Sequence, residues 1–167
     1  SETFVDLIAP SVESITLNGE SLDPATHFDG SRISLRSVAA DNELVVEATC
    51  AFMNTGEGMH RFVDPVDGEV YVYTQFEVPD ARRVMAVFEQ PDLKAEFTFT
   101  LTGPSHWQVL SNAVSPPAEP VRDGVAIWRF PATPRIPTYV TALVAGPYDV
   151  VRDSVEGRAG EIPLGVF

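Results

Sequence analysis

Polar and apolar residues alternate along several short stretches of this chain, and few stretches show the spacing of an amphipathic helix. In Glu96–Thr102 (EFTFTLT), one face of an extended chain carries two phenylalanines and a leucine, and the other face carries three threonines. Glu43–Phe52 (ELVVEATCAF) is rich in β-branched residues and alternates only in part, which predicts a strand buried on both faces. The pattern therefore predicts β-strands.

Short runs of this kind recur and are separated by turn signals such as Asn18-Gly19 and Asp29-Gly30. Most of the 14 prolines lie between the runs and disfavour helices there. Only Pro91–Ala95, where proline suits a first helical turn, and the stretch from Pro79 to Val84 predict short helical turns. The sequence predicts an all-β fold with at most one or two short helical turns. Further strands are predicted at Ser14–Asn18, Ile33–Leu35, Trp107–Leu110, Val125–Phe130, Tyr139–Ala145, Tyr148–Val151 and Ile162–Phe167.

Length and charge limit the organisation and the partners of the chain. A chain of 167 residues without repeats or a Gly/Ser-rich linker suits one domain, so we expect a single β-rich domain over residues 1–167. The net charge of −13 at pH 7 repels phosphate backbones and anionic lipids. No apolar run approaches the roughly 20 residues that cross a membrane. We therefore expect neither nucleic acid nor a membrane as a partner.

Residue types that bind metals or act as nucleophiles are scattered. His27, His60 and His106 lie outside any His-Glu-x-x-His or Cys-x-x-Cys motif, so we expect surface or hydrogen-bonded histidines. Cys50, the single cysteine, has the apolar neighbours of a buried, unreactive thiol. The nucleophile, phosphate and dinucleotide motifs of common enzyme classes are also missing. We expect no catalytic residue and no metal site in this chain.

Two acidic residues, Asp64 and Asp67, share the segment DPVDG. Aspartates in such segments often bond to their own backbone in turns. The alternative is a calcium loop, which would need alternating oxygen ligands and a closing glutamate that this segment lacks. We interpret both aspartates as turn residues.

The stretch Tyr71–Glu77 (YVYTQFE) combines a strand pattern with an amide and a carboxylate at its end. In an extended chain the two tyrosines, Gln75 and Glu77 share one face, and the residues between them share the other. Pro79 then ends the strand pairing, which leaves Glu77 where a ligand could approach. This pattern alone leaves two interpretations open: a solvated glutamate beside a turn, or a carboxylate that binds a ligand.

A longer segment around this stretch, Gly68–Leu101 (GEVYVYTQFEVPDARRVMAVFEQPDLKAEFTFTL), resembles the amino-terminal β-domain of the aminopeptidase N type of zinc aminopeptidase, most closely its actinobacterial forms. Three other segments also fit that domain, in the family's order: Gly58–Phe62 (GMHRF), Trp107–Asn112 (WQVLSN) and Trp128–Gly146 (WRFPATPRIPTYVTALVAG). Together the matches cover most of residues 4–167.

The resemblance implies a saddle-like assembly of mostly antiparallel β-sheets, docked on a thermolysin-like catalytic domain. It implies that Gln75 and Glu77, which match the family's Gln-x-Glu, are substrate-binding residues. Glu77 would bind the free α-ammonium of a peptide, and Gln75 would help to shape the pocket for the first side chain. An α-amino group has a pKa of about 8 and is largely charged at neutral pH, unlike an internal peptide nitrogen. A fixed carboxylate can therefore select chain ends.

The resemblance also implies parts that this chain does not supply. The family's zinc motif, His-Glu-x-x-His, and its Gly-x-Met-Glu-Asn strand are absent, and both belong to the catalytic domain. We expect the chain to be an inactive fragment of a cytoplasmic zinc-dependent aminopeptidase, with zinc bound by the catalytic domain. Its partners would be that domain, in the same polypeptide, and the amino terminus of a peptide substrate. The sequence leaves open whether the family's first strands are also missing.

A second hypothesis comes from a different class, a β-sandwich interaction or carbohydrate-binding module without peptidase activity. An exposed row of aromatic rings around Tyr71 and Tyr73, in an open groove, would favour this hypothesis.

Several other residues are expected to be structural. Trp107 and Trp128 suit packing against sheets. We favour solvated side chains for Arg82 and Arg83, over ion pairs or contacts with another domain. Phe88–Asp92 (FEQPD) suits a turn that supports the strand at Tyr71–Glu77, and the alternative is that its acidic groups line the same cleft.

Overall fold

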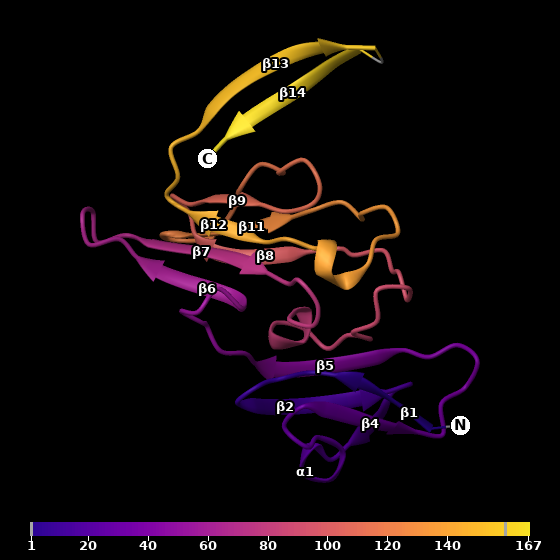
Figure 1. The fold of residues 1–167 in the computed structure, drawn as a ribbon. Helices are drawn as coiled ribbons and strands as arrows, with labels where there is room; N and C mark the ends of the chain where they lie inside the picture. Colours follow the sequence, from indigo (N-terminus) through magenta and orange to yellow (C-terminus); the bar gives the residue numbers. More distant parts are fainter. Residues whose placement is uncertain (1, 159) are drawn as a thin grey trace.

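The computed structural model describes residues 2–158 and 160–167, and it arranges them in five antiparallel sheets (Figure 1). This confirms the predicted all-β fold. The elements are β1 (Glu2–Asp6), β2 (Ser11–Leu17), β3 (Glu20–Leu22), α1 (Pro24–His27), β4 (Arg32–Arg36), β5 (Leu44–Thr49), β6 (Gly58–Val63), β7 (Val70–Gln75), the 3₁₀ turn η1 (Ala81–Arg83), β8 (Thr100–Pro104), β9 (Gln108–Leu110), β10 (Glu119–Arg122), β11 (Val125–Arg129), the 3₁₀ turn η2 (Thr138–Val140), β12 (Val144–Gly146), β13 (Val151–Gly157) and β14 (Gly160–Val166).

Two sheets at the amino-terminal end enclose the first core. β1 pairs with β4, and β2 lies between β3 and β5. The tight turn between β2 and β3 is the predicted Asn18-Gly19, whose φ angles of 53° and 82° are left-handed, as Asn and Gly allow in a two-residue hairpin loop. The buried aliphatic residues of this core are Val5, Leu7, Ile15, Ile33 and Leu35.

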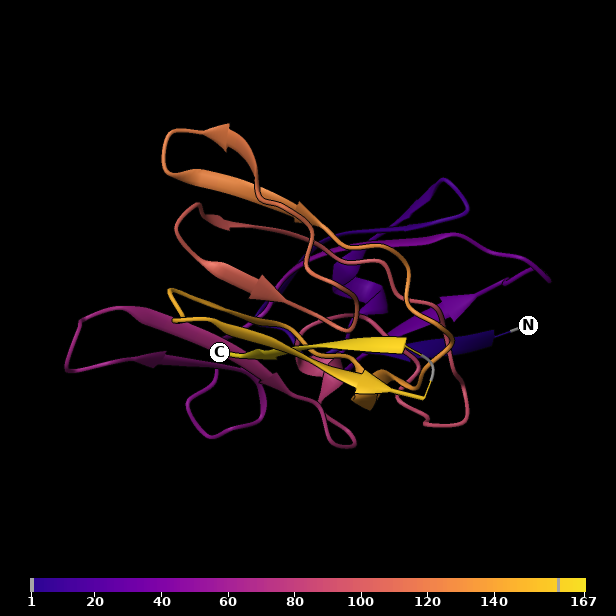
Figure 2. The same cartoon turned by 90° about the horizontal axis from the view of Figure 1, so that it is seen from above.

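Two further sheets form the middle of the molecule. One has the strand order β6-β7-β12-β9 and the other the order β10-β11-β8. Seen from above, the orange β10–β11 hairpin lies well to one side of the magenta β6–β7 hairpin (Figure 2). Trp128 is 4% exposed in the core of this region, and Trp107 packs against that core, so the packing role predicted for both is confirmed. The buried residues here are Val72, Val109, Ala126, Trp128, Phe130 and Ala145.

A third, smaller core follows the end of β7 and joins the two regions. It consists of Phe76, Ala81 and Val87. The chain segment that forms this core pairs with the end of β1. The backbones of Asp6 and Val87 exchange two hydrogen bonds of 2.7 and 3.0 Å. The N–H of Ile8 also donates to the carbonyl of Arg82 at 2.7 Å. The segment that follows β7 is therefore held by both halves of the molecule.

The last two strands form a hairpin at the opposite end of the molecule from the β1–β5 sheets (Figure 1). Residues paired across an antiparallel hairpin share a face. Pairs such as Val155–Ile162 make one face mostly apolar, and pairs such as Glu156–Glu161 make the other face polar. The aliphatic side chains of the apolar face are 48–69% exposed. They are Val151, Val155, Ile162, Leu164 and Val166.

The prediction for Glu43–Phe52 is wrong in one respect. The strand in this stretch, β5, alternates in burial, and Val45 is 53% exposed. β5 is an edge strand, and Leu44, Val46 and Ala48 pack against the amino-terminal core while the residues between them face away from it. Only one face of this sheet is covered, and the sequence does not reveal which strands have a second covering layer.

The helical turn predicted at Pro91–Ala95 is also wrong. The chain there makes a turn, in which the N–H of Leu93 donates to the carbonyl of Gln90 at 3.0 Å. Ala95 and Ile136 exchange two backbone hydrogen bonds of 3.1 and 3.0 Å, which require an extended chain. A long-range bridge thus replaces the local helix. The short turn expected between Pro79 and Val84 is present as η1.

Two of the later strand predictions are only partly correct. In Tyr139–Ala145, the first residues belong to η2, and strand pairing begins at Val144. The side chain of Asn112 binds the carbonyl of Val140 and the N–H of Ala142, at 2.8 Å each, which occupies backbone groups that a ladder would use. In Tyr148–Val151, only the last residue lies in a strand.

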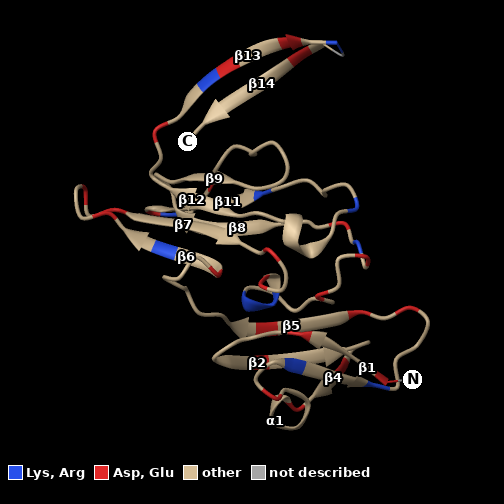
Figure 3. Ribbon diagram, in the orientation of Figure 1, with Lys and Arg blue, Asp and Glu red and all other residues tan. Residues whose placement is uncertain are grey.

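The surface charge agrees with the acidic composition. Figure 3 shows acidic residues spread from the amino-terminal sheets to the β13–β14 hairpin, with fewer basic residues between them. No helix among residues 2–158 and 160–167 is long and apolar enough to cross a membrane.

We expect Ile15→Ala to lower the free energy of unfolding by about 2–5 kcal/mol, because Ile15 is fully buried and its truncation leaves a cavity. The measurement is urea denaturation followed by tryptophan fluorescence. Val45→Ala is the matched control on the neighbouring strand, and it should change the free energy by no more than about 0.5 kcal/mol. Equal losses in both variants would contradict the assignment of the core.

Candidate functional site

Strand β7 ends at Gln75, and Glu77 begins the turn that follows. Gln75 and Glu77 are exposed, whereas Val72 and Phe76 on the opposite face are buried. The predicted division of faces is therefore confirmed. None of the ion pairs among residues 2–158 and 160–167 involves Glu77. Its carboxylate is open to a ligand from solvent.

The backbone of Glu77 is held from both sides. The side-chain oxygen of Gln75 accepts a hydrogen bond from the N–H of Glu77 at 2.9 Å. Phe76 is 2% exposed and Ala81 is fully buried, so the turn between them is anchored at each end. The Val78–Pro79 peptide bond within the turn is cis. This arrangement leaves the Glu77 side chain free while its backbone is fixed.

The prediction that the Arg83 side chain is solvated is wrong. Its Nε donates to Asp80 Oδ1 at 2.7 Å, and its Nη2 lies 3.2 Å from Glu57 Oε2. The Arg83 side chain is only 26% exposed. The neighbouring Arg82 is also partly buried, and its Nε has no hydrogen-bond partner in the described part of the chain. Both arginines pack into the segment that joins the two regions of the molecule, residues 76–87, instead of extending into water. We call this segment the junction.

Glu89 supports this junction. Its carboxylate accepts a hydrogen bond from the N–H of Arg82 at 2.8 Å and another from the hydroxyl of Thr138 at 2.7 Å. The N–H of Gln90 donates to the carbonyl of Phe88 at 2.8 Å. These contacts confirm that Phe88–Asp92 is a structural turn. They use the Glu89 carboxylate within the fold, which disfavours the alternative role in lining a cleft.

The aromatic residues of β7 are engaged by their neighbours. The Tyr71 hydroxyl donates to Asp67 Oδ2 at 2.8 Å, and its ring meets the edge of Tyr148. The Tyr73 ring stacks on His60 with centroids 4.8 Å apart. A carbohydrate-binding module would present such rings as an open row, so these contacts disfavour that hypothesis.

The remaining candidate ligands are separate, and each has a local role. His27 Nδ1 lies 3.1 Å from the carbonyl oxygen of Asp23, just before α1, and the N–H of Gly56 donates to His60 Nδ1 at 3.1 Å. His106 lies 3.6 Å from Glu69 at the surface. Asp64 and Asp67 accept backbone hydrogen bonds from residues two further along, which confirms them as turn residues. Among residues 2–158 and 160–167, no group of three or more His, Cys, Asp and Glu side chains could hold a metal ion.

The sequence of this chain matches a protein family, the peptidase M1 N-terminal domain, over residues 11–140. The match includes β7, the turn at Glu77 and the junction that follows. The chain belongs to this family. We call the fold described above the M1 domain. The family match covers most of it and leaves the β13–β14 hairpin outside.

Relatives of this M1 domain are much longer proteins. Aminopeptidase N of Streptomyces lividans is 56% identical over 167 residues, which cover 99% of this chain and 19% of that protein. Aminopeptidase N of Acetobacter pasteurianus is 40% identical over 96 residues, which cover 56% of this chain and 25% of that protein. The matched residues therefore cover about a fifth of the first relative and a quarter of the second.

A solved structure has the same fold. The crystal structure of Legionella pneumophila aminopeptidase A in complex with aspartic acid superposes with a TM-score of 0.84 and 16% sequence identity. The superposition covers 98% of this chain and 19% of that chain. At this identity the likeness shows the fold alone. Because it covers nearly the whole chain, the fold extends beyond the residues of the family match.

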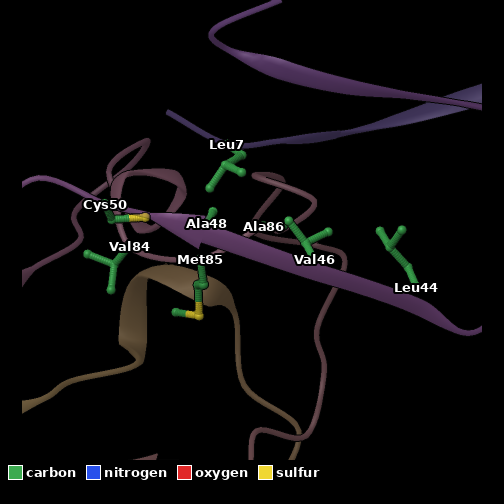
Figure 4. Close-up of a pocket in the computed structure, with 8 residues that line it drawn as sticks. All are labelled: Leu7, Leu44, Val46, Ala48, Cys50, Val84, Met85 and Ala86. Atoms are coloured by element: carbon green, nitrogen blue, oxygen red, sulfur yellow. The ribbon is translucent and has the colours of Figure 1, made fainter. Parts of the chain in front are cut away.

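The M1 domain also has an apolar pocket between β5 and the segment after η1 (Figure 4). Cys50 lies at one end of it, beside Val84 (Figure 4). The thiol is half-buried, less than we predicted. Burial raises the pKa of the Cys50 thiol, and the Glu13 carboxylate adds to this shift. The residues that line the pocket are Leu7, Leu44, Val46, Ala48, Cys50, Val84, Met85 and Ala86.

We expect Cys50 in the folded domain to react with iodoacetamide at neutral pH more slowly than in the urea-unfolded chain, because the thiolate is the reactive form and the fold disfavours it. Mass spectrometry of timed samples measures both rates. The rate in the folded domain should increase as the pH rises. Equal rates in the folded and unfolded chain would contradict this prediction.

We expect Tyr71 in the folded domain to titrate well above a tyrosine of the unfolded chain. The hydrogen bond to Asp67, followed by burial and by nearby carboxylates, raises the pKa of Tyr71 to about 12. An unfolded tyrosine has a pKa of about 10. The contribution of the Tyr71–Asp67 hydrogen bond to the stability of the fold is therefore fully present below pH 10, and it is lost as the pH rises through 12. Ultraviolet absorbance of the phenolate measures the titration. Asp67→Ala should lower the pKa of Tyr71, and Tyr71→Phe should remove that step.

Proposed function

We propose that this domain anchors the free amino end of a peptide in a zinc-dependent aminopeptidase of the M1 family, and that Glu77 binds the α-ammonium. One observation carries this proposal: an exposed carboxylate without an ion pair among the described residues sits on a turn whose backbone is fixed on both sides. The 56% identity to aminopeptidase N of Streptomyces lividans supports the activity of the whole protein.

The chemistry of the ligand fits this carboxylate. The α-amino group of a peptide has a pKa of about 8, so most peptides carry a cation at the amino end at neutral pH. Internal peptide nitrogens carry no charge. A charge-assisted hydrogen bond to Glu77 contributes about 1.5–3 kcal/mol where water is excluded. This is enough to set the register of a bound peptide, but micromolar binding needs about −8 kcal/mol, so the isolated domain binds such a peptide weakly.

Gln75 has two roles in this proposal, one toward Glu77 and one toward the ligand. Its amide oxygen holds the Glu77 backbone, as the 2.9 Å bond shows. That bond uses only the oxygen, and the amide NH₂ can still donate to a polar group of the substrate. Gln75 thus helps to shape the pocket for the first side chain while it orients the carboxylate next to it.

The described residues do not fit a zinc site, since they bring no three metal-binding side chains together. The zinc of the proposed enzyme would therefore be bound by another part of the protein, which would also supply the catalytic residues. The role of this domain is limited to binding and orienting the substrate.

We further propose that the partner of residues 1–167, as a single domain, is the catalytic domain of the same cytoplasmic polypeptide. The exposed apolar face of β13–β14 supports this proposal, because a two-stranded sheet is marginal in water and gains stability when such a face is covered. The hairpin lies outside the family match but within the similarity to the Streptomyces lividans protein. In this proposal another part of the longer chain covers the apolar face and stabilises the hairpin.

The test is Glu77→Ala in the full-length protein that contains this domain. We expect kcat/KM for alanine p-nitroanilide to fall by about 10- to 150-fold, which corresponds to the loss of one charge-assisted hydrogen bond. Zinc content, measured by atomic absorption, should not change.

Glu20→Ala on β3 is the matched control, because Glu20 is another exposed glutamate in the same domain. It should leave kcat/KM within about twofold of the unaltered protein, a difference of about 0.4 kcal/mol. If Glu77→Ala also stays within that limit, the anchoring role is wrong.

A further inference from the structure

Arg83 connects the turn that carries Glu77 with the beginning of strand β6. Its guanidinium contacts Asp80, three residues after Glu77, at 2.7 Å. It also contacts Glu57, which directly precedes β6, at 3.2 Å. The side chains of Arg83 and Asp80 are 26% and 17% exposed, so water screens this pair less than an ion pair at the surface. One arginine thus links two segments that meet beside the end of β7.

Gly58 brings these two segments close together. It pairs with Gln75 in the β6–β7 ladder, so it lies directly opposite the last residue of β7. A Cβ atom at position 58 would lie 2.9 Å from Cβ of Arg83, which is too close. The φ angle of Gly58 is 61°, a left-handed conformation that glycine adopts without strain. The Arg83 side chain can pack against β6 at this point because glycine leaves the space.

We propose that Arg83 is a positioning residue, which fixes the Glu77 turn against strand β6 and so places the carboxylate for ammonium binding. This inference rests on the function proposed above. The turn has a buried residue at each end, Phe76 and Ala81, but between them its four exposed or partly buried residues lack such an anchor. The Asp80–Arg83 pair supplies an anchor within the turn, and Glu57 ties it to the sheet.

Charge and position make opposite predictions for the loss of Arg83. If the guanidinium acted only through its charge, its removal would leave Asp80 and Glu57 uncompensated, and the more negative site would attract an ammonium more strongly. If the guanidinium acts by holding the turn, its removal weakens ammonium binding in spite of the added negative potential. The direction of the change therefore distinguishes the two roles.

The test uses four forms of the full-length protein: unaltered, Arg83→Gln, Glu77→Ala and the double variant. We expect Arg83→Gln to lower kcat/KM for alanine p-nitroanilide about 5- to 20-fold, mainly through a higher KM, because the ammonium is bound in both the ground state and the transition state. In the Glu77→Ala background, Arg83→Gln should have no further effect beyond about twofold, since two residues that act through one contact are not additive.

Two further variants separate this role from general stability. Arg32→Gln removes another ion pair to a mostly buried aspartate, Asp6 at 3.0 Å, in the β1–β4 sheet, and it should leave kcat/KM within about twofold. Gly58→Ala keeps every charge but displaces Arg83, and it should lower kcat/KM as Arg83→Gln does. Gly58→Ala also provides the test if Arg83→Gln does not fold.

The positioning role is overturned if Arg83→Gln leaves or raises kcat/KM, or if it lowers kcat/KM equally in both backgrounds. An equal loss in Arg32→Gln would overturn it as well. These results concern Arg83 only when Glu77→Ala by itself lowers activity. If Glu77→Ala has no effect, the anchoring function fails, and the positioning role fails with it.

Discussion

The burial of Phe76 together with Ala81 and Val87 is the contact on which the candidate site depends. Phe76 directly precedes Glu77, so fixing one side chain in the interior fixes the direction in which the next leaves the chain. Hydrophobic burial supplies the free energy for this, about 1.5–3 kcal/mol for a phenylalanine. The polar contacts of Gln75 and Arg83 then determine where within the turn the backbone lies. The backbone that carries the carboxylate is fixed in this way, while the side chain itself stays free to meet a ligand.

The charge of the molecule does not by itself mark a binding site. The chain has 24 acidic residues, and many of them serve the fold. Asp64 and Asp67 stabilise turns, and Glu89 joins two segments of the junction. Glu77 differs because the polar side chains near it, Gln75 and Asp80, have partners within the fold. Its own carboxylate forms no ion pair with the described residues. Glu77 therefore combines a fixed backbone with a carboxylate that no described cationic group neutralises.

The sequence predicted what depends on local pattern and missed what depends on distant contacts. The faces of Tyr71–Glu77 followed from the period of a strand, and the turn at Asn18-Gly19 followed from its residue types. The Asp80–Arg83 pair is local too, but Glu57 comes from another segment, so nothing in the spacing indicated it. The helix predicted at Pro91–Ala95 gave way to a bridge with Ile136. The nearest signal for the Arg83 contact was the glycine at position 58, whose partner only the fold reveals.

The paired backbones of Asp6 and Val87 have a consequence for the order in which the domain assembles. Contacts between residues far apart in sequence form late, because a long loop must close before they contribute any stabilisation. The segment after β7 is therefore expected to become rigid only when the amino-terminal strand has found its place. A partly folded chain would have its β6–β7 hairpin but a loose turn beside it. The chain-end recognition that we propose would in this way be restricted to molecules that have completed folding.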